Sequence, residues 1–248
     1  MPGGGDDAGT GRRGKTAMTR PPPESVPVAV FAKAPLAGAV KTRLIARLGP
    51  EPAAGLHLLL LRRTLETAVS AQTGLVSLWC TPTCDHPALT DCSRDFGVPL
   101  HAQRGADLGE RMFHALASLC RHGPALLIGC DCPALMPADL QGCAELLRYG
   151  SDAAFIPADD GGYVLIGVRN PQPFLFEGLP WGSGEVMTQT RARLAAADWH
   201  WREWRTLWDV DRPADYDRLL ATGLLGATDA VPAGGAAGSL PGRKESRL

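Results

Sequence analysis

The chain has 248 residues, 45% of them hydrophobic, and its 25 Lys and Arg against 26 Asp and Glu give a net charge of −1. This length and apolar content suffice for one large domain, and the near-neutral charge argues against a general nucleic-acid binder, which would carry a broad basic face. No apolar run approaches the roughly 20 residues that span a bilayer, and no apolar segment follows Arg12, Arg13 and Lys15, so we expect a cytoplasmic enzyme without a membrane span or a secretory signal.

Apolar runs alternate with helical stripes along the middle of the chain. The segments expected as strands are residues 28–32, 75–80, 99–103, 125–130, 153–157, 163–168 and 200–204. The segments expected as helices are residues 52–70, 108–120, 137–147, 185–196 and 213–220. This alternation predicts an α/β fold, with a mostly parallel central sheet and helices on both faces. Ligands bind such sheets outside the carboxyl ends of the strands, so the residues directly after each strand are the candidates for a site.

Both ends of the chain differ from this middle part. Residues 1–25 and 223–248 are rich in Gly, Pro and charge and lack an apolar period. We therefore expect disordered ends around a single domain that covers residues 26–222.

A basic loop follows the first expected strand. The stretch from Phe31 to Leu44 places Lys33, Lys41 and Arg43 around Gly38, and no Asp or Glu occurs between Glu24 and Glu51. Backbone N–H groups and cations converge at such a strand-to-helix turn. The loop therefore predicts an anion site that suits a polyphosphate.

An acidic residue follows the fourth expected strand. Asp131 stands between Cys130 and Cys132 at the end of a buried apolar run, where a carboxylate needs a partner. It could bind Mg²⁺ or Mn²⁺, or it could cap the following turn. The seven cysteines form no C-x-x-C pair and are expected to be free thiols, and a zinc site at Cys130 and Cys132 would lack a second ligand pair.

A second acidic group separates two expected strands. Asp159 and Asp160 are followed by Gly161 and Gly162, which is typical of a tight turn between strands. The alternative is functional, because the two glycines would let a ligand approach the backbone while one of the acids serves as a general base.

A third acidic group precedes the last expected helix. Asp211, with Pro213 in the first turn, is typical of an N-cap. Asp209 and Asp211 also alternate onto one side of an extended chain, so the segment could supply a second metal ligand.

Two weaker stretches have structural explanations as well. Asp107 and Gly109 open a helix directly after a strand and could touch a ligand, although acids in a first helical turn are ordinary. Ser183 is most simply the N-cap of the next helix, and Trp181 is either a stacking wall for a ligand or a partly buried aromatic. His57 is expected to be a surface or packing residue of its helix.

The order of these motifs resembles a bacterial GT-A-like transferase family. Its members are often labelled radical-SAM/selenodomain-associated transferases or arsenosugar-biosynthesis glycosyltransferase-like proteins. The resemblance covers about residues 27–220 and rests on six stretches of the chain, which are 31–44, 105–112, 129–133, 159–163, 180–183 and 209–211. Family members commonly have Ser in place of Cys130 and Glu in place of Asp159.

The resemblance implies a Rossmann-like nucleotide-diphospho-sugar transferase fold, a nucleotide donor and a divalent metal, Mg²⁺ or Mn²⁺, on Asp131. On this basis we predict four groups of site residues. They are Lys33, Gly38, Lys41, Thr42, Arg43, Asp107 and Gly109 for the nucleotide and its phosphates, Asp131 and Asp211 for the metal, Asp160 and Asp159 for catalysis, and Gly161, Gly162, Trp181 and Ser183 facing the acceptor or sugar.

Two reactions fit this pattern. The family label favours a glycosyltransferase that moves a sugar from a nucleotide sugar to a small-molecule acceptor. Three basic side chains in one loop instead suit the extra charge of a nucleoside triphosphate, which favours nucleotidyl transfer to a phosphorylated small molecule with release of pyrophosphate. A non-catalytic nucleotide-binding module is the third hypothesis, and the clustered Asp residues argue against it.

Overall fold

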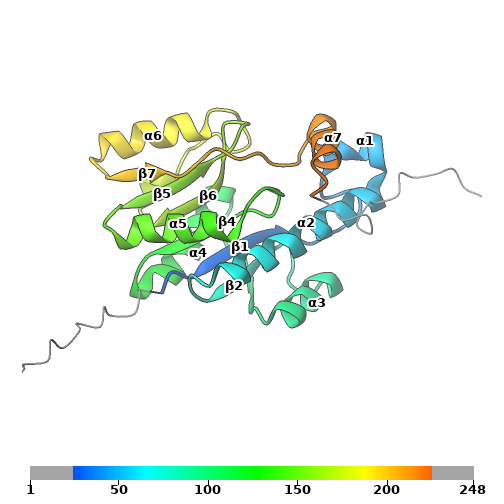
Figure 1. The fold of residues 1–248 in the computed structure, drawn as a ribbon, viewed down its shortest axis with the longest axis horizontal. Helices are drawn as coiled ribbons and strands as arrows, with labels where there is room; N and C mark the ends of the chain where they lie inside the picture. Colours follow the sequence, from blue (N-terminus) through cyan, green and yellow to red (C-terminus); the bar gives the residue numbers. More distant parts are fainter. Residues whose placement is uncertain (1–24, 225–248) are drawn as a thin grey trace, which may run out of the picture.

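The computed structural model describes residues 25–224, and it contains one seven-stranded sheet with the strand order β3-β2-β1-β4-β6-β5-β7 (Figure 1). The strands are β1 (Val28–Lys33), β2 (Val76–Thr81), β3 (Leu100–Ala102), β4 (Ala125–Ile128), β5 (Ala153–Pro157), β6 (Tyr163–Val168) and β7 (Trp201–Glu203). The helices are α1 (Ile45–Leu48), α2 (Pro50–Ala71), α3 (Pro87–Phe96), α4 (Leu108–Leu119), α5 (Pro137–Arg148), α6 (Val186–Ala196) and α7 (Pro213–Thr222). Apart from Ser25, Gly223 and Leu224, the two ends expected to be disordered lie outside the described residues.

The sheet is mostly parallel, as predicted, and β6 is the exception. This strand runs antiparallel to both β4 and β5, whereas the other neighbouring pairs are parallel. The reversal follows from the tight turn at residues 159–162, where the Gly162 carbonyl accepts a hydrogen bond from the Ala158 N–H at 3.0 Å. The prediction of a turn between strands is therefore confirmed.

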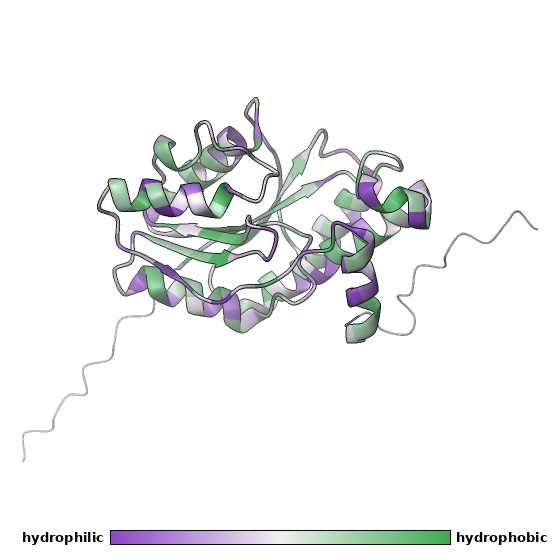
Figure 2. Cartoon of the chain, turned by 90° about the horizontal axis from the view of Figure 1, so that it is seen from above, coloured by the Kyte–Doolittle hydropathy of each residue, from purple (hydrophilic) through white to green (hydrophobic). Residues whose placement is uncertain are grey.

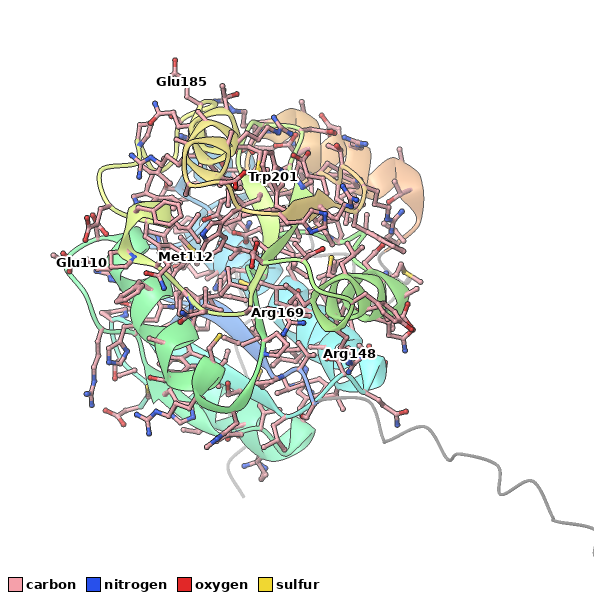
Figure 3. The ribbon with its side chains drawn as sticks, turned by 90° about the vertical axis from the view of Figure 1, so that its left-hand side faces the viewer. Glu110, Met112, Arg148, Arg169, Glu185 and Trp201 are labelled. Carbon is pink, nitrogen blue, oxygen red and sulfur yellow. The ribbon has the colours of Figure 1, made fainter. Side chains whose placement is uncertain are left out.

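Each face of the sheet is covered by its own helices. Side chains of β1 alternate, so Val28 and Val30 pack with α2, α3 and α5, while Ala29 and Phe31 pack with α4 and α6. The strands are apolar along the centre of the molecule and the polar residues of the helices lie outside (Figure 2). On α4, Met112 is buried whereas Glu110 lies at the periphery (Figure 3). The alternation predicted a sheet buried on both faces, and this is what the structure has.

A third, smaller apolar cluster lies beyond the sheet, where α1 and α7 meet the start of α2 (Figure 1). It joins Leu44 and Leu48 to residues of the segment before α7, of α7 and of α2, which are Trp208, Val210, Tyr216, Leu219, Leu56 and Leu60. Burial of this much apolar surface fixes the basic loop against the segment that precedes α7. The loop after β1 and the segment that leads into α7 are thus packed together beside the carboxyl end of β1.

Several local expectations were wrong. Helix α3 was not expected, because polar residues interrupt its apolar pattern. The basic loop leads into a 3₁₀ turn (Thr42–Leu44) and the one-turn helix α1 before Gly49 at φ 87°, whereas the helix expected over residues 52–70 is confirmed as α2. Neither Ser183 nor Asp211 is an N-cap, since the caps of α6 and α7 are Glu185 and Arg212. No helix within residues 25–224 has the length and apolar character needed to cross a membrane.

Strand β4 also ends two residues earlier than expected, at Ile128 instead of Cys130. Cys130 and Asp131 therefore lie beyond the sheet, while the Gly129 N–H still donates to the Val164 carbonyl of β6 at 3.3 Å.

Asp139, in the first turn of α5, is the most completely paired buried carboxylate of this region. Its side chain is 4% exposed and accepts hydrogen bonds from Arg205 at 2.6 and 2.7 Å, from the Trp204 indole at 3.1 Å and from the Met136 N–H at 2.8 Å. These contacts tie α5 to the chain that follows β7. Removing the carboxylate would leave several buried donors without an acceptor.

We expect Asp139→Ala to lower the free energy of unfolding by about 3 kcal/mol, because a buried, multiply bonded partner is lost. The matched control is Asp95→Ala, which removes an exposed pair with Arg62 and should cost less than about 1 kcal/mol. Urea unfolding followed by circular dichroism measures both. Equal losses in the two variants would contradict the role given to Asp139.

Candidate functional site

The basic loop is held by the buried ammonium group of Lys41. This residue has a left-handed backbone at φ 48°, which is uncommon for a side chain other than Gly. Its side chain is 4% exposed, contacts Oδ1 of Asp131 and donates a hydrogen bond to the Val210 carbonyl at 2.6 Å. Strained backbone of this kind persists where surrounding contacts hold it. Lys41 thus joins the loop after β1, the end of β4 and the segment before α7.

Asp131 is the carboxylate at the centre of these contacts. Burial alone would raise its pKa, but the Lys41 ammonium and the nearby His57 lower it below the ordinary value. Burial alone would likewise lower the pKa of Lys41, and Asp131 raises it above the ordinary value. The pair is therefore ionised at neutral pH.

His57 completes the wall behind Asp131, which sequence reasoning missed. It belongs to the buried stripe of α2 and hydrogen-bonds through Nε2 to the Lys33 carbonyl at 2.9 Å. Its Nδ1 lies 4.0 Å from both Oδ1 of Asp131 and Sγ of Cys130. Burial lowers the pKa of His57, so the ring is neutral with its proton on Nε2.

All seven cysteines are free thiols, as expected. Among the described residues, Cys130 gathers with His57 and Asp131 as a group of potential metal donors, and Cys132 is not part of that group. Burial raises the pKa of the Cys130 thiol, which keeps it protonated in the absence of a metal. The zinc pair of Cys130 and Cys132 considered above therefore gains no support.

Three cavities meet at Gly129, just beyond β4. The basic cavity has a volume of about 460 Å³, and its polar wall is made by Lys33, Lys41, Thr42, His57, Thr81, Gln103, Arg111, Asp131 and Asp211. The acid cavity has about 130 Å³ and is lined by Asp131, Asp160 and Asp209. The aromatic cavity has about 190 Å³ and is lined by Phe31, Met112, Tyr163 and Trp181, with Asp160 and Ser183. Gly129 lines all three, and a Cβ atom built there meets no atom within 4 Å.

A larger cavity of about 560 Å³ lies at the opposite ends of the strands, beside Pro27, Gly74 and Pro99. The described residues that line it include neither an acid nor a Lys or Arg. It is therefore not the place where the chemistry suggested by the motifs would occur.

The four acids that follow β5 and precede α7 have different surroundings. Asp160 faces the acid and aromatic cavities and accepts a hydrogen bond on Oδ1 from the Gly162 N–H at 2.9 Å. Asp159 is exposed and pairs with Arg218 at 3.0 Å. Asp209 lines the acid cavity, and burial, with the charges of Asp160 and Asp131, raises its pKa to about 6. Asp211 instead pairs with Arg43 at the edge of the basic cavity.

The structure therefore brings together some of the predicted residues and separates others. Lys33, Lys41, Thr42, Asp131, Asp211, Asp160, Gly162, Trp181 and Ser183 line the three cavities. Asp107 instead caps α4 by accepting the Glu110 N–H at 2.8 Å, and the cavity wall nearby is made by Leu108 and Arg111.

Three predicted glycines and Arg43 lie outside these linings. A Cβ at Gly109 would come within 2.8 Å of the Trp181 indole, and one at Gly161 within 2.0 Å of the Gly184 carbonyl, so both positions allow close packing. Gly38 supplies a left-handed residue at φ 82° in the basic loop. Arg43 reaches the basic cavity only through its partner Asp211.

Residues 64–183 match a family model described as "Uncharacterized protein conserved in bacteria (DUF2064)". No curated protein matches the chain. A crystal structure from Desulfovibrio desulfuricans G20, provisionally described as a nucleotide-diphospho-sugar transferase, is 29% identical with a TM-score of 0.73, and the match covers 84% of this chain and 91% of that one.

Two more distant structures share the fold. A Methanothermobacter nucleotidyl transferase is 15% identical with a TM-score of 0.55, and the match covers 81% of this chain and 99% of that one. A 4-diphosphocytidyl-2C-methyl-D-erythritol synthase from Anaerococcus prevotii DSM 20548 is 12% identical with a TM-score of 0.54, over 80% of this chain and 96% of that one. The chain therefore has the GT-A-like nucleotide-diphospho-sugar transferase fold that the order of its motifs predicted.

We expect Lys41→Met to raise the pKa of Asp131 and to lower the free energy of unfolding at neutral pH by about 2 kcal/mol, because a partly exposed carboxylate loses its cation. Since the folded pKa of Asp131 is depressed, this stabilisation is present above its ordinary value of 3.8 and disappears as the pH falls through the folded value. Urea unfolding at neutral and acidic pH measures it.

Arg43→Met is the matched control for this experiment. It removes an exposed pair and should change stability by less than about 1 kcal/mol at either pH. A Lys41→Met loss that stays constant into acid would show that the ion pair is not its source.

Proposed function

We propose that this protein is a metal-dependent transferase that uses a nucleotide-activated donor, and that it transfers a sugar from a nucleotide sugar to the hydroxyl group of a small acceptor. The observation that carries the proposal is the meeting of the three cavities at Gly129. A cationic space for phosphates, a carboxylate-lined space for a metal and an apolar space for an acceptor share this single junction.

The basic cavity suits the phosphates of the donor. Lys33, Arg111 and Thr42 line it with the ammonium of Lys41. A lysine has three N–H donors, of which Asp131 and the Val210 carbonyl take two. The third donor of Lys41 is therefore available to a phosphate oxygen, which would place that oxygen beside Asp131.

The acid cavity suits a divalent cation. Asp131 and Asp209 face the same small space, and their mutual repulsion, with that of Asp160, helps to raise the pKa of Asp209. Carboxylate oxygens in this number are the donors that Mg²⁺ and Mn²⁺ prefer. We therefore assign the metal to Asp131 and Asp209, since Asp211, the second ligand expected from the sequence, is paired with Arg43. A bound cation would neutralise charge on the departing phosphate.

We assign the general base to Asp160. Its Oδ1 accepts the Gly162 N–H, which fixes the carboxylate and leaves Oδ2 to receive a proton. The acceptor hydroxyl would give its proton to Oδ2 while its oxygen bonds to the anomeric carbon of the sugar. The bond between that carbon and the donor phosphate breaks, and the nucleoside diphosphate leaves with the electron pair. Asp159, the other predicted catalytic acid, points to Arg218 instead.

Nucleotidyl transfer is the second candidate, and the charge of the basic cavity favours it. Lys33, Lys41 and Arg111 in one wall could balance the charge of a nucleoside triphosphate. In that reaction the acceptor oxygen attacks the α-phosphate and pyrophosphate leaves. A module that binds a nucleotide without turnover is the third hypothesis.

A donor panel tests the proposed function. Nucleotide sugars, nucleoside diphosphates and triphosphates are screened by thermal shift with and without Mg²⁺ or Mn²⁺, and we expect metal-dependent stabilisation by a nucleotide sugar, because phosphate and metal would bind together. Release of a nucleoside diphosphate on addition of acceptor supports glycosyl transfer, whereas release of pyrophosphate from a triphosphate supports the second candidate. Binding without turnover of any donor supports the third.

Gly129→Val is the control for the location of this binding. Its side chain would project into the junction, and the glycine has no positive φ that a valine would strain. The variant should fold and lose the stabilisation by donor. Retained stabilisation would place the donor outside these cavities.

The assignment of the metal ligands can be tested separately. We expect Asp131→Asn and Asp209→Asn to weaken Mn²⁺ binding in the presence of donor at least tenfold, as measured by the paramagnetic relaxation of water protons, because each removes a charged oxygen ligand. Asp211→Asn is the matched control and should change it by less than threefold. If Asp211→Asn weakened Mn²⁺ binding more than Asp209→Asn did, Asp211 would be the second metal ligand, as the sequence suggested.

A further inference from the structure

We propose that the aromatic cavity selects an uncharged acceptor whose body is apolar and about the size of one ring, and which presents a single hydroxyl group to Asp160. This inference rests on the proposed function and names the class of its acceptor. Neither the family match nor the similar structures identify an acceptor for this chain.

The lining of the cavity is the first argument. It is made mainly by large apolar and aromatic side chains, which are Phe31, Leu108, Met112, Leu127, Tyr163, Val164, Trp181 and Val186. Among the described residues that line it, Asp160 is the only charged one, and none is a Lys, Arg or His. Apart from Asp160, the lining residues with polar side-chain atoms are Ser183, Tyr163 and Trp181, and of these the Trp181 Nε1 is buried and the Tyr163 hydroxyl contacts the Met112 sulfur at 3.9 Å.

This lining excludes two common kinds of acceptor. A phosphate or carboxylate group would be desolvated beside the negative charge of Asp160 without a cation to balance it. A sugar ring would bring several hydroxyl groups into a space with few partners, and unpaired buried hydroxyls oppose binding. A compound with an apolar body and one hydroxyl group avoids both costs.

The cavity has room for a body of this size. Its volume of about 190 Å³ is enough to hold one aromatic or aliphatic ring. The rings of Tyr163 and Trp181 stand at 90° with their centres 6.3 Å apart, so a ligand ring can stack on one and meet the edge of the other.

The wall is also held in place. The absence of a side chain at Gly109 lets the Trp181 ring pack against α4. The turn that carries Asp160 is bound to the segment after Trp181, because the Met187 N–H donates to the Gly161 carbonyl at 2.8 Å and Gly161 packs on Gly184. The Asp160 carboxylate and the aromatic wall are therefore held at fixed positions relative to each other, as a selective pocket requires.

The opening of the cavity gives the ligand its direction. The aromatic and acid cavities share Gly129, Asp160, Gly162, Tyr163 and Val164. An apolar body inside the aromatic cavity therefore presents its polar end to Asp160 and to the carboxylates beyond it. This is the orientation that the transfer step needs.

Benzyl alcohol is the probe for this proposal, with benzoate and glucose as its charged and polyhydroxylated counterparts. Binding is followed by nuclear magnetic resonance of the ¹⁵N-labelled full chain, with the indole signal of Trp181 identified by its absence from Trp181→Phe. We expect benzyl alcohol to shift this signal with saturation, and benzoate and glucose to leave it unchanged.

Two variants test the site of binding. Trp181→Ala removes the wall, and Ser183→Trp blocks the exposed rim of the cavity without entering the core. Each variant should weaken benzyl alcohol binding about tenfold or more. Binding to both is followed through the ¹³C-labelled methyl group of Met112, which also lines the cavity. Leu75→Ser, at the other apolar cavity, is the matched control and should leave binding unchanged.

The outcomes separate this inference from the proposed function. Saturable binding of benzoate or glucose at the same site, or no response of the Trp181 signal to any probe, would overturn the acceptor class. Donor and metal binding are measured in the same variants by thermal shift and should persist in all of them. If the unmodified protein binds neither donor nor metal, the proposed function is overturned instead.

Discussion

The burial of one ammonium group, that of Lys41, is the interaction on which the rest of the site depends. Its partners Asp131 and Val210 lie 90 and 169 residues further along the chain. A buried cation needs such partners, so the pairing forces three segments to meet at one point and keeps Lys41 in its left-handed backbone. The cavities open around that point because Gly129, which lies two residues before Asp131, has no side chain to fill the space.

Much of the fold could be predicted from the sequence, because continuous apolar runs and helical stripes report burial directly. The strands at residues 153–157 and 163–168 were placed without error. The Asp-Gly turn between them was also predicted, but the antiparallel direction of β6 that follows from this turn was not. Helix α3 was not predicted because only two of its residues, Leu89 and Cys92, are buried, which is too few to form a recognisable apolar stripe.

The site was predictable in part. Lys41 and Asp131 could be found because both follow strands of a parallel sheet, where such residues converge. The partners of Asp159 and Asp211 could not, since Arg218 lies 59 residues from the first and Arg43 lies 168 residues from the second. His57 was missed for a different reason. Its spacing fits the buried stripe of α2, and spacing does not reveal that the end of the stripe faces a cavity.

The apolar cluster that joins α1 to α7 has a consequence for the order in which the protein becomes complete. A chain is synthesised from its N-terminus, so β1 and the basic loop emerge early. Lys41 then lacks its carboxylate until β4 has been made, and it lacks the Val210 carbonyl and the cover of Tyr216 and Leu219 until the fold is almost finished. The candidate site is therefore among the last features to form during synthesis, because an unfinished chain lacks part of the wall of its cavities.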